Sequence, residues 1–143
     1  MKTRKLSHNG NNSISHEEIT GLPLKAFSGR IVVVKDSSAL PKVFTEVRKH
    51  KVVGFDTETR PSFKKGEIHI VSLLQLAIPR KAFLIRLNHT GLTDEITGFL
   101  ENDSIVKAGV GIHDDVKALH KLNKFKAAGF VELSTRPIIN TGD

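Results

Sequence analysis

Hydrophobic and polar positions alternate along the chain with two different periods, and each period predicts its own kind of element. The run Arg30–Lys35, RIVVVK, is rich in β-branched residues and predicts a strand. In the segment 38–50 the apolar residues recur three and four positions apart, which is typical of a helix with one buried face. The residues of that face are Leu40, Val43, Phe44 and Val47.

After this helix the same reasoning predicts further strands and helices. Pro79-Arg80 predicts a turn that joins two of the strands as a hairpin, and Thr93 is expected to cap the helix that follows. A hairpin followed by strand–helix–strand units predicts an α/β domain with a mixed sheet flanked by helices. The expected strands are Val52–Glu58, Ile68–Ile78, Ala82–Leu87, Ile105–Ala108 and Phe130–Leu133, and the expected helices are Leu92–Leu100 and Ile112–Leu122.

The chain has two regions of different composition. Residues 1–20 begin with a polar stretch rich in Asn, Ser and Lys and are expected to form a mostly disordered tail. The predicted strands all fall within residues 21–143, and a chain of 143 residues has the length of one domain. We therefore predict a single domain over residues 21–143.

Charge and cysteine content narrow the class of partner and the compartment. Lys and Arg number 22 against 15 for Asp and Glu, which gives a formal net charge of +7. This balance favours a polyanionic partner, because neutralising phosphates releases counterions. The absence of cysteine excludes disulfides and thiolate ligands and favours the cytoplasm. No apolar run is long enough to cross a bilayer, so no membrane partner is expected.

The strand Val52–Glu58 ends in two carboxylates, Asp56 and Glu58, two residues apart. Successive side chains of a strand point to opposite faces, so these two share a face, with their Cα atoms about 6 to 7 Å apart. Two negative charges at that distance repel each other, and burial strengthens the repulsion. The pair therefore indicates a site for a positive charge.

A third carboxylate stands in the helix predicted at Ile112–Leu122. The helical period places Asp115 within the apolar stripe, whereas Asp114 falls on the solvated flank. A carboxylate in the stripe needs a hydrogen bond, an ion pair or a metal ion, because an isolated buried charge is costly. The alternative is a partly exposed Asp near the helix start, stabilised by the helix dipole. The sequence leaves both interpretations open.

Together, Asp56, Glu58 and Asp115 predict a metal centre. Mg²⁺ and Mn²⁺ prefer carboxylate oxygens and retain water. A pair of such ions can activate a water and stabilise the leaving oxygen of a phosphodiester. This chemistry agrees with the polyanionic partner that the net charge favours.

Two segments carry a resemblance to a known family. FDTETRP, with Asp56 and Glu58, resembles the first motif of the DEDD 3′-5′ exonuclease superfamily, and KAGVGIHDDVKAL resembles its second motif. The spacing G-x-G-x-x-x-D-x-x-x-L at 109–119 is most similar to the Werner-syndrome-type exonuclease domain and its bacterial relatives. The segments LLQLA and FVEL are also similar to that subfamily. Both motifs in order, one on a strand and one on a helix, are a specific signal where either alone is weak.

The resemblance implies a ribonuclease H-like fold and hydrolysis of terminal phosphodiester bonds, with two divalent ions, Mg²⁺ or Mn²⁺, as cofactors. It implies that Asp56, Glu58 and Asp115 are catalytic and bind the metals, with Glu58 also helping to orient the attacking water. Thr57, Thr59 and Gln75 are expected to be structural. Nucleic acid is the expected partner, with DNA favoured over RNA. Three basic residues after the acidic strand are expected to hold phosphates near the site: Arg60, Lys64 and Lys65.

The family's third motif has no counterpart in this sequence. That motif places a final Asp on a downstream helix, preceded four residues earlier by a Tyr or five residues earlier by a His. The chain contains no Tyr, and its last residue, Asp143, follows Asp115 by only 28 residues in a different context. The sequence therefore predicts an incomplete domain, truncated at its C-terminus, whose own activity is an open question.

Two other functions remain open. Gly109-Val-Gly111 follows a strand and opens a helix, and Glu132 ends the next strand, as in a dinucleotide-binding site. However, Asp114 stands where that motif has its third glycine, and acidic residues at the helix start would repel a pyrophosphate. The other alternative is a non-catalytic nucleic-acid-binding module that retains the exonuclease fold, which the missing third motif favours.

Overall fold

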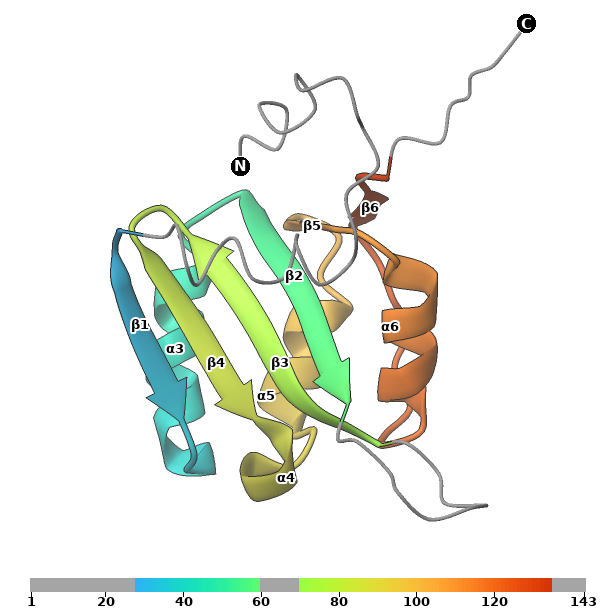
Figure 1. The fold of residues 1–143 in the computed structure, drawn as a ribbon, viewed down its shortest axis with the longest axis horizontal. Coiled ribbons are helices and arrows are strands. Elements are labelled where there is room, and N and C mark those ends of the chain that lie inside the picture. Colours follow the sequence, from blue (N-terminus) through green and yellow to red (C-terminus); the bar gives the residue numbers. More distant parts are fainter. Residues whose placement is uncertain (1–27, 60–69, 135–143) are drawn as a thin grey trace, which may run out of the picture.

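A six-stranded mixed sheet forms the middle of the molecule, in the strand order β1-β4-β3-β2-β5-β6 (Figure 1). The structure is a computed structural model that describes residues 28–59 and 70–134. β3 pairs antiparallel with β2 and β4, whereas β1 runs parallel to β4, and β5 runs parallel to β2 and β6. The strands are β1 (Arg30–Val34), β2 (Val52–Thr59), β3 (Val71–Ile78), β4 (Lys81–Arg86), β5 (Val106–Gly109) and β6 (Phe130–Glu132).

Helices cover one face of this sheet. In Figure 1, α3 and α5 lie behind the sheet and pack against each other, and α6 lies beside β2. Asp36 caps the short 3₁₀ helix η1 that precedes α3, because its carboxylate accepts a hydrogen bond from the Ser38 main-chain N–H at 3.0 Å. The helical segments are η1 (Ser37–Ala39), α3 (Leu40–Val47), α4 (Leu87–Thr90), α5 (Asp94–Leu100) and α6 (Ile112–His120).

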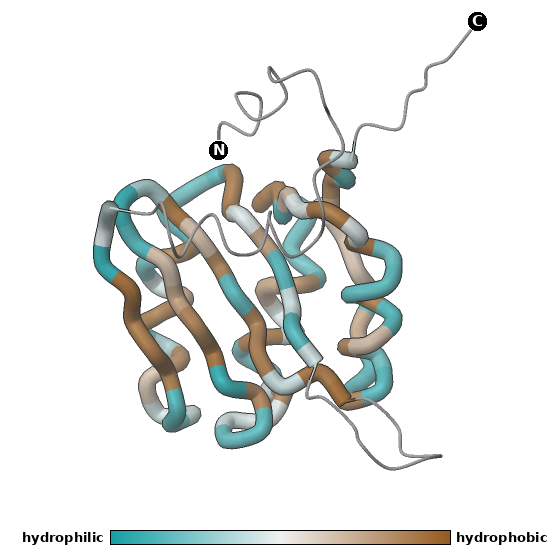
Figure 2. The backbone as a smooth tube through the Cα atoms, in the orientation of Figure 1, coloured by the Kyte–Doolittle hydropathy of each residue, from teal (hydrophilic) through white to brown (hydrophobic). Residues whose placement is uncertain are grey.

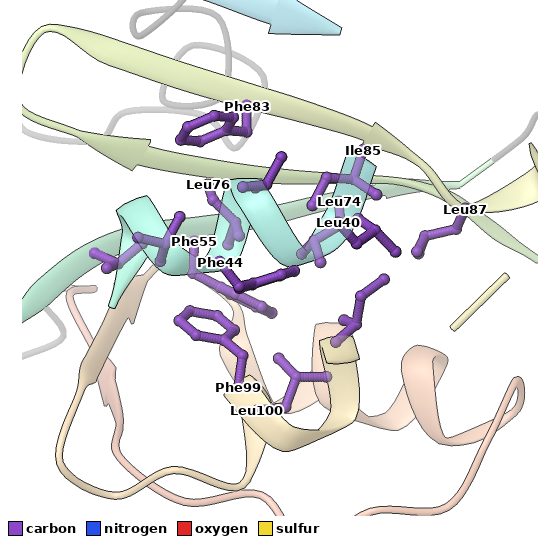
Figure 3. Close-up of a cluster of buried hydrophobic side chains, with 14 of the residues drawn as sticks. Leu40, Phe44, Phe55, Leu74, Leu76, Phe83, Ile85, Leu87, Phe99 and Leu100 are labelled. Carbon is purple, nitrogen blue, oxygen red and sulfur yellow. The ribbon is translucent and has the colours of Figure 1, made fainter. Parts of the chain in front are cut away.

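The hydrophobic core lies between the sheet and the helices α3 and α5 (Figure 3). Phe44 of α3 and Phe99 of α5 meet with their ring centroids 5.1 Å apart, and both side chains are buried. Burying each large apolar side chain is worth roughly 1.5 to 3 kcal/mol. The central strands contribute their helix-facing residues to the same cluster, among them Leu74, Leu76 and Ile85.

The predicted order of strands and helices is confirmed, and so is the mixed sheet. The short helix α4 was not predicted, and α6 ends at His120, two residues earlier than expected. Thr93 is the N-cap residue of α5, as predicted, but its side chain makes no capping hydrogen bond. Asp94 and Glu95 in the first turn place negative charge at the positive end of that helix instead.

Some predictions fall outside the described residues. These are the disordered tail at 1–20 and the start of the long strand at 68–69. Among the residues that are described, no helix combines the length and the apolar character needed to cross a membrane.

Candidate active site

The acidic pair of β2 lies on the face of the sheet turned away from α3 and α5. Val53, Phe55 and Thr57 are buried. Asp56 and Glu58 alternate with these residues, so they point to the opposite face, where both are half-buried. The two carboxylates therefore share a face, as the sequence predicts.

The neighbours of the pair on β3 are one polar and one apolar residue. Across the ladder to β3, Asp56 stands opposite Gln75 and Glu58 opposite Leu73. Figure 2 shows that hydrophobic residues predominate in β1, β4 and β3, with hydrophilic ones among them in β3 and β4, and that hydrophilic residues recur in the second half of β2. The register shifts just after Glu58, and irregularities of this kind recur beside active sites, where they re-aim side chains.

The third predicted carboxylate lies in the first turns of α6. This helix begins after Gly111, whose φ of 72° is a left-handed conformation that favours glycine. Asp115 is only 8% exposed and is buried together with Ile112 and Leu119, whereas Asp114 is exposed. The interpretation that places Asp115 inside the apolar stripe is therefore correct, and the partly exposed alternative is wrong.

A hydrogen bond joins Asp115 to the strand of the acidic pair. The hydroxyl of Thr57 donates to Oδ1 of Asp115 at 2.8 Å, and both side chains are buried. A buried carboxylate needs such a donor, because desolvation otherwise disfavours its charged form. Thr57 is thus buried and bonded to Asp115, a partner that no local pattern in the sequence indicates.

Glu132 at the end of β6 binds the start of α6. Its Oε2 accepts a hydrogen bond from the main-chain N–H of Gly111, and its Oε1 accepts one from Ile112, each at 2.9 Å. Burial raises the pKa of Glu132, but the main-chain donors of Gly111, Ile112 and Ser134 together outweigh it, so that this pKa lies below its usual value. Glu132 therefore carries its negative charge at neutral pH.

This arrangement argues against the dinucleotide-binding alternative. In that arrangement a pyrophosphate lies at the helix N-terminus and the acidic residue of the next strand binds a ribose. Here the carboxylate of Glu132 itself occupies the helix N-terminus. The main-chain N–H groups that would bind a pyrophosphate are thus bonded to Glu132, and the carboxylate that would bind a ribose is bonded to them.

A buried lysine lies in β5, the strand between β2 and β6. Lys107 of β5 is fully buried, and its Nζ donates to the main-chain oxygens of Phe99 at 3.0 Å and Asn102 at 2.6 Å. Burial lowers the pKa of Lys107 to about 8. The burial of Lys107 was not predicted, although its position two residues after the buried Ile105 indicates that its side chain points inward.

The donor chemistry of the three carboxylates fits a hard divalent ion. The structure brings them to one segment of β2, but Asp115 approaches from the side of Thr57, whereas Asp56 and Glu58 point to the other face. Within residues 28–59 and 70–134, no three His, Cys, Asp or Glu side chains form a group that could hold a metal ion. A shared metal site for all three stays a prediction.

The predicted phosphate-binding residues lie outside the described part of the chain. They are Arg60, Lys64 and Lys65. Gln75, expected to be structural, is buried opposite Asp56 in the ladder between β2 and β3.

Comparison with known sequences identifies the class of protein that this chain resembles. Residues 31–141 match the family described as 3′-5′ exonuclease. The chain is similar to the bifunctional 3′-5′ exonuclease/ATP-dependent helicase WRN of Mus musculus, with 33% identity over 119 residues that make up 79% of this chain and 8% of that protein. It is also similar to a 3′-5′ exonuclease of Arabidopsis thaliana, with 32% identity over 111 residues, 68% of this chain and 38% of that protein. The chain thus spans well under half the length of these two relatives.

Solved structures share the fold. The complex of Trypanosoma brucei RNase D with RNA U12 has a TM-score of 0.63 and 19% identity, over 73% of this chain and 38% of that one. The EXD2 exonuclease domain has a TM-score of 0.58 and 25% identity, over 71% of this chain and 56% of that one. The same domain soaked in Mn and GMP matches with a TM-score of 0.55 and 24% identity, over 71% of this chain and 55% of that one. The predicted ribonuclease H-like mixed sheet flanked by helices is therefore confirmed.

Proposed function

Because the chain belongs to the 3′-5′ exonuclease family, we propose that it hydrolyses the terminal phosphodiester bond at the 3′ end of a nucleic acid. The observation that carries this proposal is the 2.8 Å hydrogen bond from Thr57 to Asp115. It ties the carboxylate of the second family motif to the strand that bears the first, between Asp56 and Glu58. This bond joins residues 58 positions apart, so the two motifs meet in the folded chain.

The three carboxylates are the proposed catalytic residues and ligands of divalent ions. Asp56 and Glu58 present oxygen donors from one face of β2, and Thr57 restrains the carboxylate of Asp115 at the same strand. When bound, Mg²⁺ or Mn²⁺ supplies positive charge that stabilises a phosphodiester under attack and makes water a better nucleophile. The EXD2 exonuclease domain has been soaked in Mn and in Mg, each with GMP, which supports divalent ions as the metals of the family.

A nucleic acid is the substrate class that the charge of the chain favours. The net charge of +7 attracts phosphates, and the related RNase D is known in complex with RNA. Arg60, Lys64 and Lys65 directly follow the acidic pair in the sequence and are proposed to hold the backbone of the substrate. DNA is the proposed substrate over RNA, from the likeness to the Werner-type exonuclease.

The test is a pair of measurements on matched variants. Calorimetry with Mn²⁺ is run on the wild type, on Asp56→Asn and on Asp114→Asn, the exposed neighbour of Asp115. We expect Asp56→Asn to abolish Mn²⁺ binding without loss of stability, because it removes one of two repelling charges. Asp114→Asn is expected to keep wild-type affinity. Unchanged Mn²⁺ affinity in Asp56→Asn would show that the site is assigned wrongly.

Turnover is measured separately, with end-labelled single-stranded and recessed 3′ substrates of DNA and RNA in the presence of Mn²⁺. Stepwise loss of 3′ nucleotides by the wild type, and none by Asp56→Asn, is the expected result. Retained nucleic-acid binding with no cleavage by the wild type would instead support the second candidate, a non-catalytic binding module. The net charge of +7 favours that candidate as well, because positive charge attracts a phosphate backbone whether or not the bound strand is cleaved.

A further inference from the structure

Helix α6 has no side chain of its own to cap its N-terminus. Its N-cap residue is Gly111, which provides no capping side chain. The first main-chain N–H groups of a helix have no partner inside the helix and need one from elsewhere. Glu132 supplies it from another element, through the hydrogen bonds from Gly111 and Ile112 at 2.9 Å.

Glu132 is itself fixed by the sheet. In the parallel ladder between β5 and β6 it stands opposite Gly109, and the Leu133 main-chain N–H donates to the Gly109 carbonyl at 2.7 Å. Gly109 in turn approaches β2 closely, since a Cβ at this position would collide with the main-chain oxygen of Phe55. β6, which bears Glu132, is therefore connected through β5 to β2, the strand that bears Asp56.

We propose that Glu132 is a positioning residue for Asp115. It sets where α6 starts, and Asp115 lies one turn into that helix, where the Thr57 hydroxyl fixes its Oδ1 at 2.8 Å. Two anchors, one on the helix start and one on the carboxylate, place Asp115 beside the acidic strand. This inference rests on the proposed function, in which Asp115 is a metal ligand whose position matters for catalysis.

A positioning role makes a quantitative prediction. Residues that orient a metal ligand without touching the metal change metal affinity by roughly 10- to 100-fold when replaced. Glu132→Gln keeps the size of the side chain but replaces one acceptor oxygen by a donor, which cannot pair with a main-chain N–H. One of the two hydrogen bonds from Gly111 and Ile112 is lost, so we expect the first turn of α6 to become more mobile.

The matched control is Glu101→Gln. The Oε2 of Glu101 also accepts a hydrogen bond from a main-chain N–H, that of Lys126, at 2.9 Å on the surface. This variant removes the same charge and the same type of bond at the end of α5, away from the start of α6. An effect seen in Glu132→Gln but not in Glu101→Gln is therefore due to the location of the hydrogen bonds at the start of α6, and not to the loss of a charge or of a bond of this type.

The readouts are amide hydrogen exchange at Gly111 and Ile112, the side-chain carboxyl ¹³C shift of Asp115, Mn²⁺ affinity by calorimetry, and kcat and KM for the labelled oligonucleotide. In Glu132→Gln we expect faster exchange, a displaced Asp115 signal, a 10- to 100-fold loss of Mn²⁺ affinity and a lower kcat with little change in KM. Glu101→Gln is expected to match the wild type in all four. If Glu132→Gln does not fold, Glu132→Asp, which keeps the charge but has a shorter reach, is measured in the same way.

The outcomes separate this inference from the proposed function. An Asp115 signal that is unchanged in the Glu132 variant overturns the positioning role, whether or not the wild type binds Mn²⁺. A wild type that neither binds Mn²⁺ nor cleaves overturns the proposed function, and the Asp115 signal still decides the role of Glu132. Equal losses in the Glu132 and Glu101 variants would also overturn the inference, since they would reflect a general loss of stability.

Discussion

Among single residues, the lysine buried in β5 has a charge that depends strongly on its surroundings. Lys107 is fully buried, its Nζ binds the carbonyl oxygens of Phe99 and Asn102, and it lies within 5.3 Å of the centroids of two aromatic rings. These contacts favour the charged form, but burial dominates and lowers its pKa from 10.5 to about 8. The folded protein therefore releases this proton at a lower pH than the unfolded chain does.

We expect the free energy of unfolding to increase as the pH rises from about 8 to 10.5, because the unfolded chain binds more protons in this window. At about 1.4 kcal/mol per pKa unit, the full gain is at most about 3 kcal/mol, and solvent screening reduces it. Urea unfolding followed by circular dichroism across this range measures it, free of tyrosine titration because the chain has no Tyr. The increase should vanish in Lys107→Met and persist in Lys121→Met, a change at an exposed lysine. A flat wild-type profile would contradict the prediction.

The sequence predicts burial at single positions better than it predicts partners. The helical period places Asp115 within the apolar stripe of α6, because that stripe is a local property, but it left open a partly exposed position near the helix start that the structure rules out. Its partner Thr57 is 58 residues away in sequence, and Glu132 is 20 residues from the Ile112 amide that it binds. Such pairs depend on how whole elements pack, which no local pattern encodes.

At the scale of elements, the approach of β5 to β2 leaves no room for a side chain at Gly109. A Cβ there would collide with the main-chain oxygen of Phe55. Gly98, in the middle of α5, is the opposite case, since a Cβ there would meet no atom within 4 Å beyond its chain neighbours and the backbone of its own helix. Packing thus requires a glycine at position 109, whereas position 98 has room for a side chain.

We expect Gly109→Ala to lower the free energy of unfolding by about 1 to 3 kcal/mol, because β5 must move away from β2. Gly98→Ala should raise it by about 1 kcal/mol, because alanine loses less backbone entropy than glycine in a helix. Urea midpoints of both variants at one pH provide the comparison. A neutral Gly109→Ala would show that the two strands tolerate a wider separation.

The order of elements could be read from the sequence because each has a clear period and turn signals at its ends. The ends of the helices were less predictable. Thr93 occupies the N-cap of α5 without a side-chain hydrogen bond, and α6 is capped from a distant strand by Glu132. Capping residues inside the sequence of a helix can be recognised, but a cap donated by another element becomes visible only in the fold.

At the scale of the whole molecule, the two faces of the sheet differ in chemistry. One is covered by α3 and α5 and holds the core, while the other carries the acidic pair at the end of β2. The whole chain is nevertheless strongly basic, at +7. The location of its positive charge, and not its sum, therefore decides where a nucleic acid would bind.

A comparison of two lysine pairs tests that location. Lys64 and Lys65 follow the acidic strand in sequence, whereas Lys42 and Lys49 are exposed on α3 and just after it, in the helical layer. For a single-stranded oligonucleotide, each phosphate contact contributes about 0.7 to the slope of log K against log salt concentration. Replacing Lys64 and Lys65 by Gln should therefore reduce the slope by about 1.4 and weaken binding at low salt, while the Lys42 and Lys49 double variant should match the wild type. Fluorescence anisotropy over a salt series measures both slopes. Equal reductions in the two variants would mean that the net charge attracts the substrate without directing it to the face that carries Asp56 and Glu58.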